Sequence, residues 1–217
     1  MKISILTLFP QMFIGPFDHS IVKHAKEKSL VEINLIDIRG FGIGKHKIVD
    51  DKPYGGGQGM ILKVDVLKSA INSVRNKKLK KDEEKIILMS AKGETYSQKL
   101  AKDYSKLKHL IIICGHYEGI DDRILNYIDA EISVGDYIST GGEIPAMLIT
   151  DSVVRLIPGV LKIGVVENES FTVKNVLEHP QYTRPETYDG KSVPKILLEG
   201  HHKNIETWKE KNKKTKN

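Results

Sequence analysis

Two glycine-bearing polar loops, each directly after an apolar run, carry the residue types best suited to bind a small ligand. The stretch SVGDYISTGGEIPA covers residues 133–146, and CGHYEGIDDRI covers residues 114–124. Ligands of open α/β sheets bind at the carboxyl ends of the strands, so two such loops at neighbouring strand ends would form one pocket. Backbone groups there could recognise a flat heterocycle, because glycine places no side chain in the way.

Single residues in the 114–124 loop leave alternatives open. His116 is either a general base or a hydrogen-bonded turn residue, and we favour the turn residue. We interpret Asp121 and Asp122 as caps of the helix that follows rather than as catalytic acids. Cys114, the only cysteine, ends the apolar run 110–114. Its position favours a buried small side chain over a nucleophile, and a lone cysteine excludes disulfide stapling within the chain.

Two further motifs each have a structural and a functional interpretation. The segment PYGGGQGM at 53–60 lacks both the Gly-Lys-Ser/Thr ending of a P-loop and the dinucleotide spacing G-x-G-x-x-G. A loop that closes over a substrate fits it better than a phosphate cradle, and a plain mobile connection is the alternative. The histidine pair at 201–202 has no Cys or His partners at ligand spacing, which favours a surface helix cap over a metal site.

The elements that would position these loops alternate between strands and helices. Five short apolar runs predict strands, and five segments with helical spacing lie between or after them. This alternation predicts an α/β fold with a parallel sheet covered by helices on both faces. The predicted strands are 3–9, 31–38, 85–90, 110–114 and 130–134, and the predicted helices are 21–25, 64–74, 96–107, 120–127 and 145–157.

The chain is basic, which suggests a polyanionic partner. Its formal net charge is +6 and its pI is about 9.1. Lysine and arginine that neutralise phosphates gain affinity by releasing counterions. Only five of the 34 basic residues are Arg, so the charge alone is a weak signal. We interpret the basic clusters at 75–81 and 209–217 as solvated segments rather than specific sites.

The 217 residues, 40% of them apolar, allow one full-sized domain and a small appendage. We predict a first domain at 1–160, a linker at 161–174 and a small domain at 175–217. No apolar run approaches the roughly 20 residues that span a bilayer, and the N-terminus lacks a cleavage site. The sequence therefore predicts a cytoplasmic protein.

Six blocks, in order, resemble the bacterial tRNA (guanine(37)-N(1))-methyltransferase family, over Lys2 to about Trp208. The resemblance implies an S-adenosylmethionine-dependent enzyme of the SPOUT class that methylates ring nitrogen 1 of guanine 37 in tRNA. It also implies a deep C-terminal trefoil knot, a rare exception to the rule against threaded loops. The blocks are FP at 9–10, VDDKPYGGGQGM at 49–60, CGHYEGIDDR at 114–123, SVGDYISTGGEIPAM at 133–147, DSVVRLIPGVL at 151–161 and HPQYTRPE at 179–186.

The resemblance assigns two sets of binding residues. The set implied for the methyl donor lies in the predicted pocket loops, and the set implied for tRNA lies in the glycine-rich segment and the small domain. The donor set is Leu88, Ser90, Gly115, Tyr117, Glu118, Val134, Gly135, Asp136, Tyr137, Ile138, Ser139, Gly141, Gly142 and Pro145. The tRNA set is Tyr54, Gly55, Gly56, Gly57, Gly59, His179, Tyr182 and Arg184.

The reaction needs a base, because ring nitrogen 1 of guanine carries a proton at neutral pH. Until that proton is removed, the nitrogen is a poor nucleophile. The resemblance implies that Arg155 steadies oxygen 6 of the flipped-out base. It places Glu169 at the general-base position, where the family usually has Asp. Glu167 is the alternative base, although its spacing to Ser170 and Phe171 does not match.

The resemblance also implies partners and marks departures. It implies a homodimer with the active site at the subunit interface and a divalent ion, Mg²⁺, whose ligands the sequence does not identify. Gln58 stands where the family commonly has proline, and the small helical C-terminal domain is expected to be truncated at Asn217. Three alternatives stay open: a knotted methyltransferase with another RNA target, a catalytically impaired RNA-binding homologue, and a nucleotide-binding α/β regulator.

Overall fold

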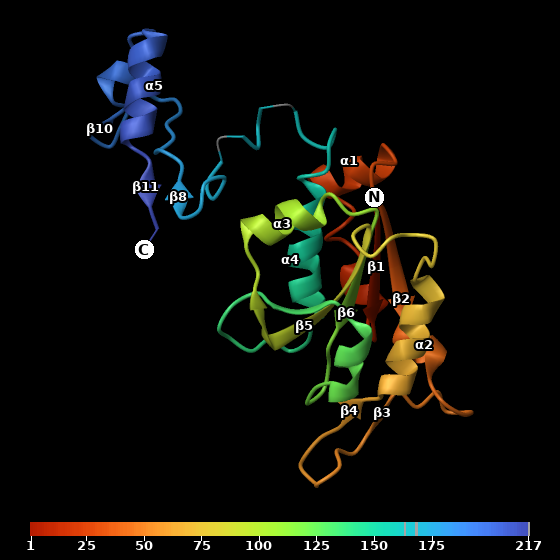
Figure 1. Cartoon of the computed structure of the whole chain (residues 1–217). Coiled ribbons are helices and arrows are strands. Elements are labelled where there is room, and N and C mark those ends of the chain that lie inside the picture. The colour runs from red at the N-terminus through yellow and green to blue at the C-terminus, as the bar shows by residue number, and fades with distance from the viewer. Residues whose placement is uncertain (163, 168, 217) are drawn as a thin grey trace. The chain divides into compact units, whose positions relative to one another are not determined.

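A five-stranded parallel sheet forms the centre of the first of two compact units, Met1–Leu161, in a computed structural model that describes residues 1–162, 164–167 and 169–216 (Figure 1). Every neighbouring pair in the sheet is parallel, which confirms the predicted sheet. In spatial order the strands are β2 (Glu32–Asp37), β1 (Lys2–Thr7), β6 (His109–Cys114), β5 (Glu84–Thr95) and β7 (Ala130–Ser133).

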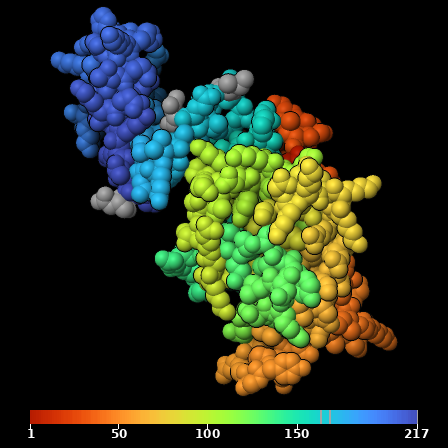
Figure 2. Space-filling model, in the orientation of Figure 1, coloured from red at the N-terminus to blue at the C-terminus, as the bar shows by residue number. Residues whose placement is uncertain are grey.

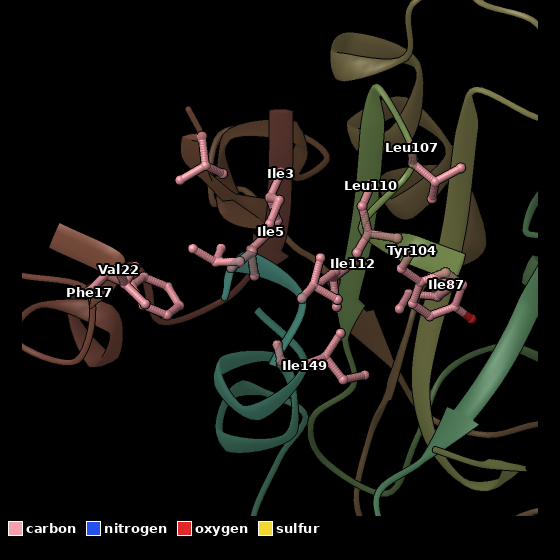
Figure 3. Close-up of a cluster of buried hydrophobic side chains, with 14 of the residues drawn as sticks. Ile3, Ile5, Phe17, Val22, Ile87, Tyr104, Leu107, Leu110, Ile112 and Ile149 are labelled. Carbon is pink, nitrogen blue, oxygen red and sulfur yellow. The ribbon is translucent and has the colours of Figure 1, made fainter. Parts of the chain in front are cut away.

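The inner strands β1 and β6 and the first half of β5 read as largely apolar runs because they are buried on both faces, whereas the edge strand β2 is partly exposed. Successive side chains of a strand point to opposite faces, so Leu110 and Ile112 of β6 join one core cluster while Ile111 and Ile113 join the other. Figure 3 shows the first cluster, in which Leu110, Ile112 and Ile149 lie together. The buried apolar side chains on both faces hold the sheet rigid beneath the loops at its carboxyl edge.

Helices cover both faces, as predicted. The helices α1 (Ser20–Glu27), α3 (Gln98–Tyr104) and α4 (Glu143–Val154) contribute to the first core cluster, together with the 3₁₀ helix η1 (Pro10–Phe13). The helix α2 (Val64–Val74) and the 3₁₀ helices η2 (Ile38–Phe41) and η3 (Asp122–Tyr127) contribute to the second. Each helix therefore buries one apolar stripe against the sheet.

Several predicted elements differ from the observed ones in type or extent. The expected helix at 120–127 is the 3₁₀ helix η3, which Asp121 caps by accepting from the backbone N–H of Arg123 at 3.0 Å. Strand β5 continues five residues past Ser90 to Thr95, because β7 pairs with it on both sides of a register shift. Helix α4 begins at Glu143, two residues before Pro145, and ends at Val154.

A small antiparallel ladder carries the glycine-rich segment. Strand β3 (Asp50–Asp51) pairs with β4 (Ile61–Leu62), and the loop between them contains residues 52–60. In Figures 1 and 2 this loop, in orange, projects from the lower end of the first unit. The loop is therefore accessible at its tip and fixed at its base.

The second compact unit is Lys162–Asn217. Two antiparallel pairs, β9 with β10 and β8 with β11, accompany one α-helix in it. Within the described ranges of the chain, no helix is long and apolar enough to cross a membrane. The elements are β8 (Val176–Leu177), β9 (Thr187–Tyr188), β10 (Lys191–Ser192), η4 (Lys195–Leu197), α5 (His202–Lys211) and β11 (Lys214–Thr215).

Candidate active site

One pocket at the carboxyl ends of β6 and β7, beside residues 88–92 of β5, brings together the loops that the sequence predicts to bind a ligand. Its volume is about 320 Å³, which falls in the range of roughly 300–1,000 Å³ typical of small-molecule sites. Of the fourteen residues implied for the methyl donor, thirteen line it and Asp136 does not. The thirteen are Leu88, Ser90, Gly115, Tyr117, Glu118, Val134, Gly135, Tyr137, Ile138, Ser139, Gly141, Gly142 and Pro145.

Two glycines allow chain segments to come into direct backbone contact, Gly142 in the lining of the pocket and Gly93 beside it. The N–H of Gly142 donates to the carbonyl of Gly115 at 2.7 Å, and a Cβ on Gly142 would lie 2.7 Å from Cys114 Cα. A Cβ on Gly93, in β5, would lie 2.4 Å from the backbone nitrogen of Ile132 in β7. A side chain at either position would force these segments apart, so both glycines are required by space.

The loop after β7 is shaped by local hydrogen bonds. Gly135, at φ +152°, donates its N–H to the hydroxyl of Ser133 at 3.2 Å and accepts from the N–H of Tyr137 at 2.9 Å. On the facing loop, Tyr117 adopts φ +61°, a left-handed conformation that costs free energy in a non-glycine residue. Both loops that line the pocket therefore hold unusual backbone conformations.

The glycine-rich segment is tied to the pocket through its base. The N–H of Glu118 donates to the carbonyl of Met60 at 3.1 Å, and the N–H of Leu62 donates to the carbonyl of Gly119 at 3.0 Å. A Cβ on Gly59 would lie 2.3 Å from Cγ of Glu118. Glu118, implied for the donor, thus contacts the segment implied for tRNA.

The tip of the glycine-rich segment is exposed and relies on backbone conformations that suit glycine. Gly55, Gly56, Gly57 and Gly59 have φ values of +84°, +82°, +132° and +81°. The side chain of Tyr54 is 99% exposed. The structure therefore leaves this segment open to a large partner, and its assignment to tRNA stays a prediction.

A buried polar cluster of Thr7, His116 and Glu143 adjoins the pocket and was not predicted from the sequence. Glu143, at the start of α4, is 1% exposed, and its Oε1 accepts a hydrogen bond from the buried hydroxyl of Thr7 at 2.8 Å. His116 Nδ1 lies 3.8 Å from Oε2 of Glu143 and has no hydrogen-bond partner among the described atoms. The expectation of a hydrogen-bonded turn residue at His116 is therefore wrong for Nδ1.

Cys114 is fully buried beside this cluster, which confirms the expected buried side chain. Burial raises the pKa of its thiol well above the ordinary value, and the nearby Glu143 carboxylate raises this pKa further. The thiol therefore stays protonated at neutral pH and is a poor nucleophile.

The two residues implied for catalysis lie in different units. Arg155 is the C-cap residue of α4 in the first unit and donates its backbone N–H to the carbonyl of Asp151 at 3.2 Å. Glu169 lies in the second unit, and its carbonyl accepts from the N–H of Thr172 at 3.1 Å. Their catalytic roles stay predictions.

The turn after Glu169 is fixed by a carboxylate that the sequence did not single out. Ser170 donates its N–H to Oε1 of Glu178 at 3.1 Å, and the N–H of Glu178 donates to the hydroxyl of Ser170 at 3.0 Å. This reciprocal pair joins the segment that carries Glu169 to the start of the HPQYTRPE block.

Two of the residues implied for tRNA in the second unit surround its one tryptophan. The ring centroids of His179 and Tyr182 lie 6.0 Å and 6.3 Å from that of Trp208 in α5. Arg184 is exposed. Trp208 was not predicted as a site residue; being the only tryptophan of the chain was its one signal. The cluster offers aromatic surfaces of the kind on which unpaired bases stack.

His201 and His202, expected as a surface helix cap, are both exposed at the start of α5. His201 occupies the N-cap position of α5, but its side chain makes no capping hydrogen bond. In residues 1–162, 164–167 and 169–216, no group of three or more His, Cys, Asp or Glu could hold a metal ion.

A parallel sheet flanked by helices, with a glycine-lined pocket at strand ends, is typical of α/β proteins that bind a small ligand. The chain belongs to the family described as tRNA (Guanine-1)-methyltransferase TrmD, whose sequence model matches residues 1–217. This match confirms the resemblance noted from the six blocks.

Curated relatives agree with this assignment. The chain is 50% identical over 212 residues to a tRNA (guanine-N(1)-)-methyltransferase of Dictyoglomus turgidum, covering 97% of this chain and 84% of the relative. It is 51% identical over 213 residues to one of Carboxydothermus hydrogenoformans, covering 97% and 82%. It is 48% identical over 225 residues to one of Endomicrobium trichonymphae, covering 100% and 96%.

Proposed function

We propose that this protein transfers a methyl group from S-adenosylmethionine to ring nitrogen 1 of the guanine at tRNA position 37, in the cytoplasm. The observation that carries the proposal is the pocket at the ends of β6 and β7 and beside residues 88–92 of β5, lined by thirteen residues implied for the donor. Family membership over the full chain supplies the reaction class. The basic net charge of +6 suits an RNA substrate.

The pocket fits an adenosine-bearing donor. Leu88, Val134 and Pro145 give it apolar walls, while Ser90, Glu118 and Ser139 are polar residues of its lining. Apolar walls with a few fixed polar groups are the usual way to bind a flat heterocycle. When bound, S-adenosylmethionine supplies an electrophilic methyl group on a sulfonium.

Two side chains would act on the guanine. Glu169 removes the proton from ring nitrogen 1, and Arg155 donates hydrogen bonds to oxygen 6, where negative charge collects as that proton leaves. A guanidinium suits this role because its donors are planar and always charged. General-base catalysis typically contributes about 10²–10⁴-fold to the rate.

We also propose a homodimer that pairs the Arg155 of one copy with the Glu169 of the other. Support comes from exposed apolar side chains next to the pocket. Ile144 and Leu148, one turn apart on α4, are 59% and 45% exposed, and Ile138 on the adjoining loop is 84% exposed. A second copy of the chain would cover this surface, and a two-fold axis would create two equivalent sites.

A trefoil knot is the proposed topology of residues 84–154. Its support is the path of the chain, which leaves β7 at one edge of the sheet and returns to contact the end of β6 through Gly142. The resemblance also implies Mg²⁺, but the described residues hold no set of three ligands for it. No step above is derived through a metal ion.

The test is transfer of labelled methyl from S-adenosylmethionine to two tRNA transcripts that carry guanine or adenine at position 37. Wild type should methylate only the guanine transcript. Glu169→Gln should lose about 10²–10⁴-fold in rate, whereas the matched change Glu167→Gln should retain activity. Equal rates in the two variants would mean that Glu169 is not the base. Binding of the methyl donor without transfer would indicate another RNA target or an RNA-binding homologue without activity.

A further inference from the structure

His116 and Glu143 lie in an arrangement that no role described so far uses. The imidazole of His116 packs between the rings of Phe9 and Tyr117, with centroid distances of 4.7 Å and 5.2 Å. Its Nδ1 is buried and has no hydrogen-bond partner among the described atoms. The nearest carboxylate oxygen is Oε2 of Glu143, at 3.8 Å, which is too long for a hydrogen bond.

The carboxylate is held from its far side. Glu143 is 1% exposed, and its Oε1 accepts from the hydroxyl of Thr7 at 2.8 Å. The same hydroxyl accepts from the backbone N–H of Phe9 at 2.9 Å, so Thr7 cannot rotate away without breaking a second bond. A buried carboxylate is costly unless several donors satisfy it, and His116 Nδ1 is the donor placed to reach Oε2.

The gap between the two groups is kept open by a glycine. A Cβ on Gly141 would lie 2.4 Å from Oε2 of Glu143 and 2.6 Å from Nδ1 of His116. Any side chain at 141 would therefore sit between the imidazole and the carboxylate. The absence of a Cβ leaves a direct line between them, which a packing role for His116 alone does not require.

We propose that His116 and Glu143 are positioning residues that close into a hydrogen bond when the methyl donor fills the pocket. The proposal rests on the proposed function of that pocket. His116, Gly141 and Gly142 line it, so closure from 3.8 Å to about 2.8 Å, the length of a charge-assisted bond, draws the loops after β6 and β7 together. A donor that excludes water strengthens the pair, because its attraction grows as the local dielectric falls.

Two substitutions of His116 separate this role from simple packing. In His116→Asn, the amide nitrogen takes the place of Nδ1, while the ring is lost. In His116→Phe, the ring contacts with Phe9 and Tyr117 remain, while the hydrogen-bond donor Nδ1 is lost. The probe is S-adenosylmethionine, and the measured quantity is its Kd by calorimetry without RNA.

We expect His116→Phe to weaken donor binding by about 10- to 100-fold, the loss typical of a hydrogen bond to a charged group. His116→Asn should stay within about threefold of wild type, and His24→Phe, on the exposed surface of α1, should match wild type. In steady-state assays the loss in His116→Phe should appear in KM for the donor more than in kcat. The reverse order, with Asn weak and Phe tight, would overturn the proposal.

A double-mutant cycle with Glu143→Gln checks that the two side chains act together. Glu143→Gln should weaken donor binding alone and add little in the His116→Phe background, because the bond is already lost. Independent, additive losses would contradict the pair. Wild type that binds donor but never methylates tRNA would refute the proposed function and leave this pair testable by Kd, whereas wild type that fails to bind donor would refute both.

Discussion

Replacing Gly142 by Ala tests whether close backbone contact builds the pocket. The added Cβ would lie 2.7 Å from both Cys114 Cα and Gly115 N, and 3.0 Å from Met89 Cβ. Ordinary contact begins at 3.4 Å, so 3.4 minus 2.7 leaves about 0.7 Å of forced movement. Gly142 has φ −80°, a conformation that alanine adopts without strain, so the collision is the whole perturbation.

Two terms set the magnitude. Overpacking a well-packed site costs about 1–3 kcal/mol. Moving Gly142 also breaks or stretches its 2.7 Å bond to the carbonyl of Gly115, which contributes about 0.5–1.5 kcal/mol. We therefore expect Gly142→Ala to lower the free energy of unfolding by about 1.5–4.5 kcal/mol. Donor binding should weaken as well, because the displaced segment lines the pocket.

Urea unfolding and donor calorimetry measure both effects. Gly40→Ala is the matched control, because a Cβ there meets nothing within 4 Å and the backbone φ is not left-handed. The control should stay within about 0.5 kcal/mol of wild type. If Gly142→Ala kept the unfolding midpoint and the methyl-donor Kd of wild type, the backbone contact between Gly142 and Cys114 would be deformable rather than rigid. The steric argument would then fail.

Three further outcomes are expected. Leu148→Glu should give a monomer by sedimentation, with little methyl transfer. The control Ile48→Glu changes a similarly exposed residue in another part of the first unit and should stay dimeric. A dimeric Leu148→Glu would refute the α4 interface. Burial lowers the pKa of His109 below its ordinary 6.5, so the free energy of unfolding should have its full value above pH 6.5 and decrease as the pH falls below 6.5, by at most about 1.4 kcal/mol per pH unit. Urea unfolding at several pH values should show a weaker pH dependence of this free energy in His109→Gln. An equal pH dependence would contradict the assignment to His109. Glu178→Ala should lower kcat by releasing the turn at Ser170 without changing the donor Kd; an unchanged kcat would show that the turn holds itself.

Most of the sheet could be predicted from the sequence because its inner strands are buried on both faces and read as apolar runs. The exception is the end of β5, where residues 91–95 read AKGET and lack that pattern. They form a strand only because β7 lies beside them after a register shift. The 3₁₀ form of η3 was equally hidden, since its apolar spacing matches that of an α-helix and the cap at Asp121 suits either.

The pocket loops could be predicted because they follow strands, and strand ends converge in a parallel sheet. The residues beneath and beside them could not. Thr7 and Glu143 are hydrogen-bonded across 136 positions of sequence, and no local pattern encodes a contact of that range. Glu178 reads as an ordinary surface acid until its bond to Ser170 is seen.

The glycines show most clearly what sequence alone leaves unresolved, because two different needs produce the same letter. Gly55 and Gly56 have left-handed backbones and open space around them, so a substitution there would cost conformational free energy while meeting no neighbour. Gly141 and Gly142 have no left-handed φ, but a Cβ would strike His116, Glu143 or the backbone of β6. Alanine should therefore disturb the mobility and partner contacts of the first pair, and the internal assembly of the pocket at the second. The connection between β7 and α4 carries Gly141 and Gly142 because another part of the same chain occupies the space that a side chain would need.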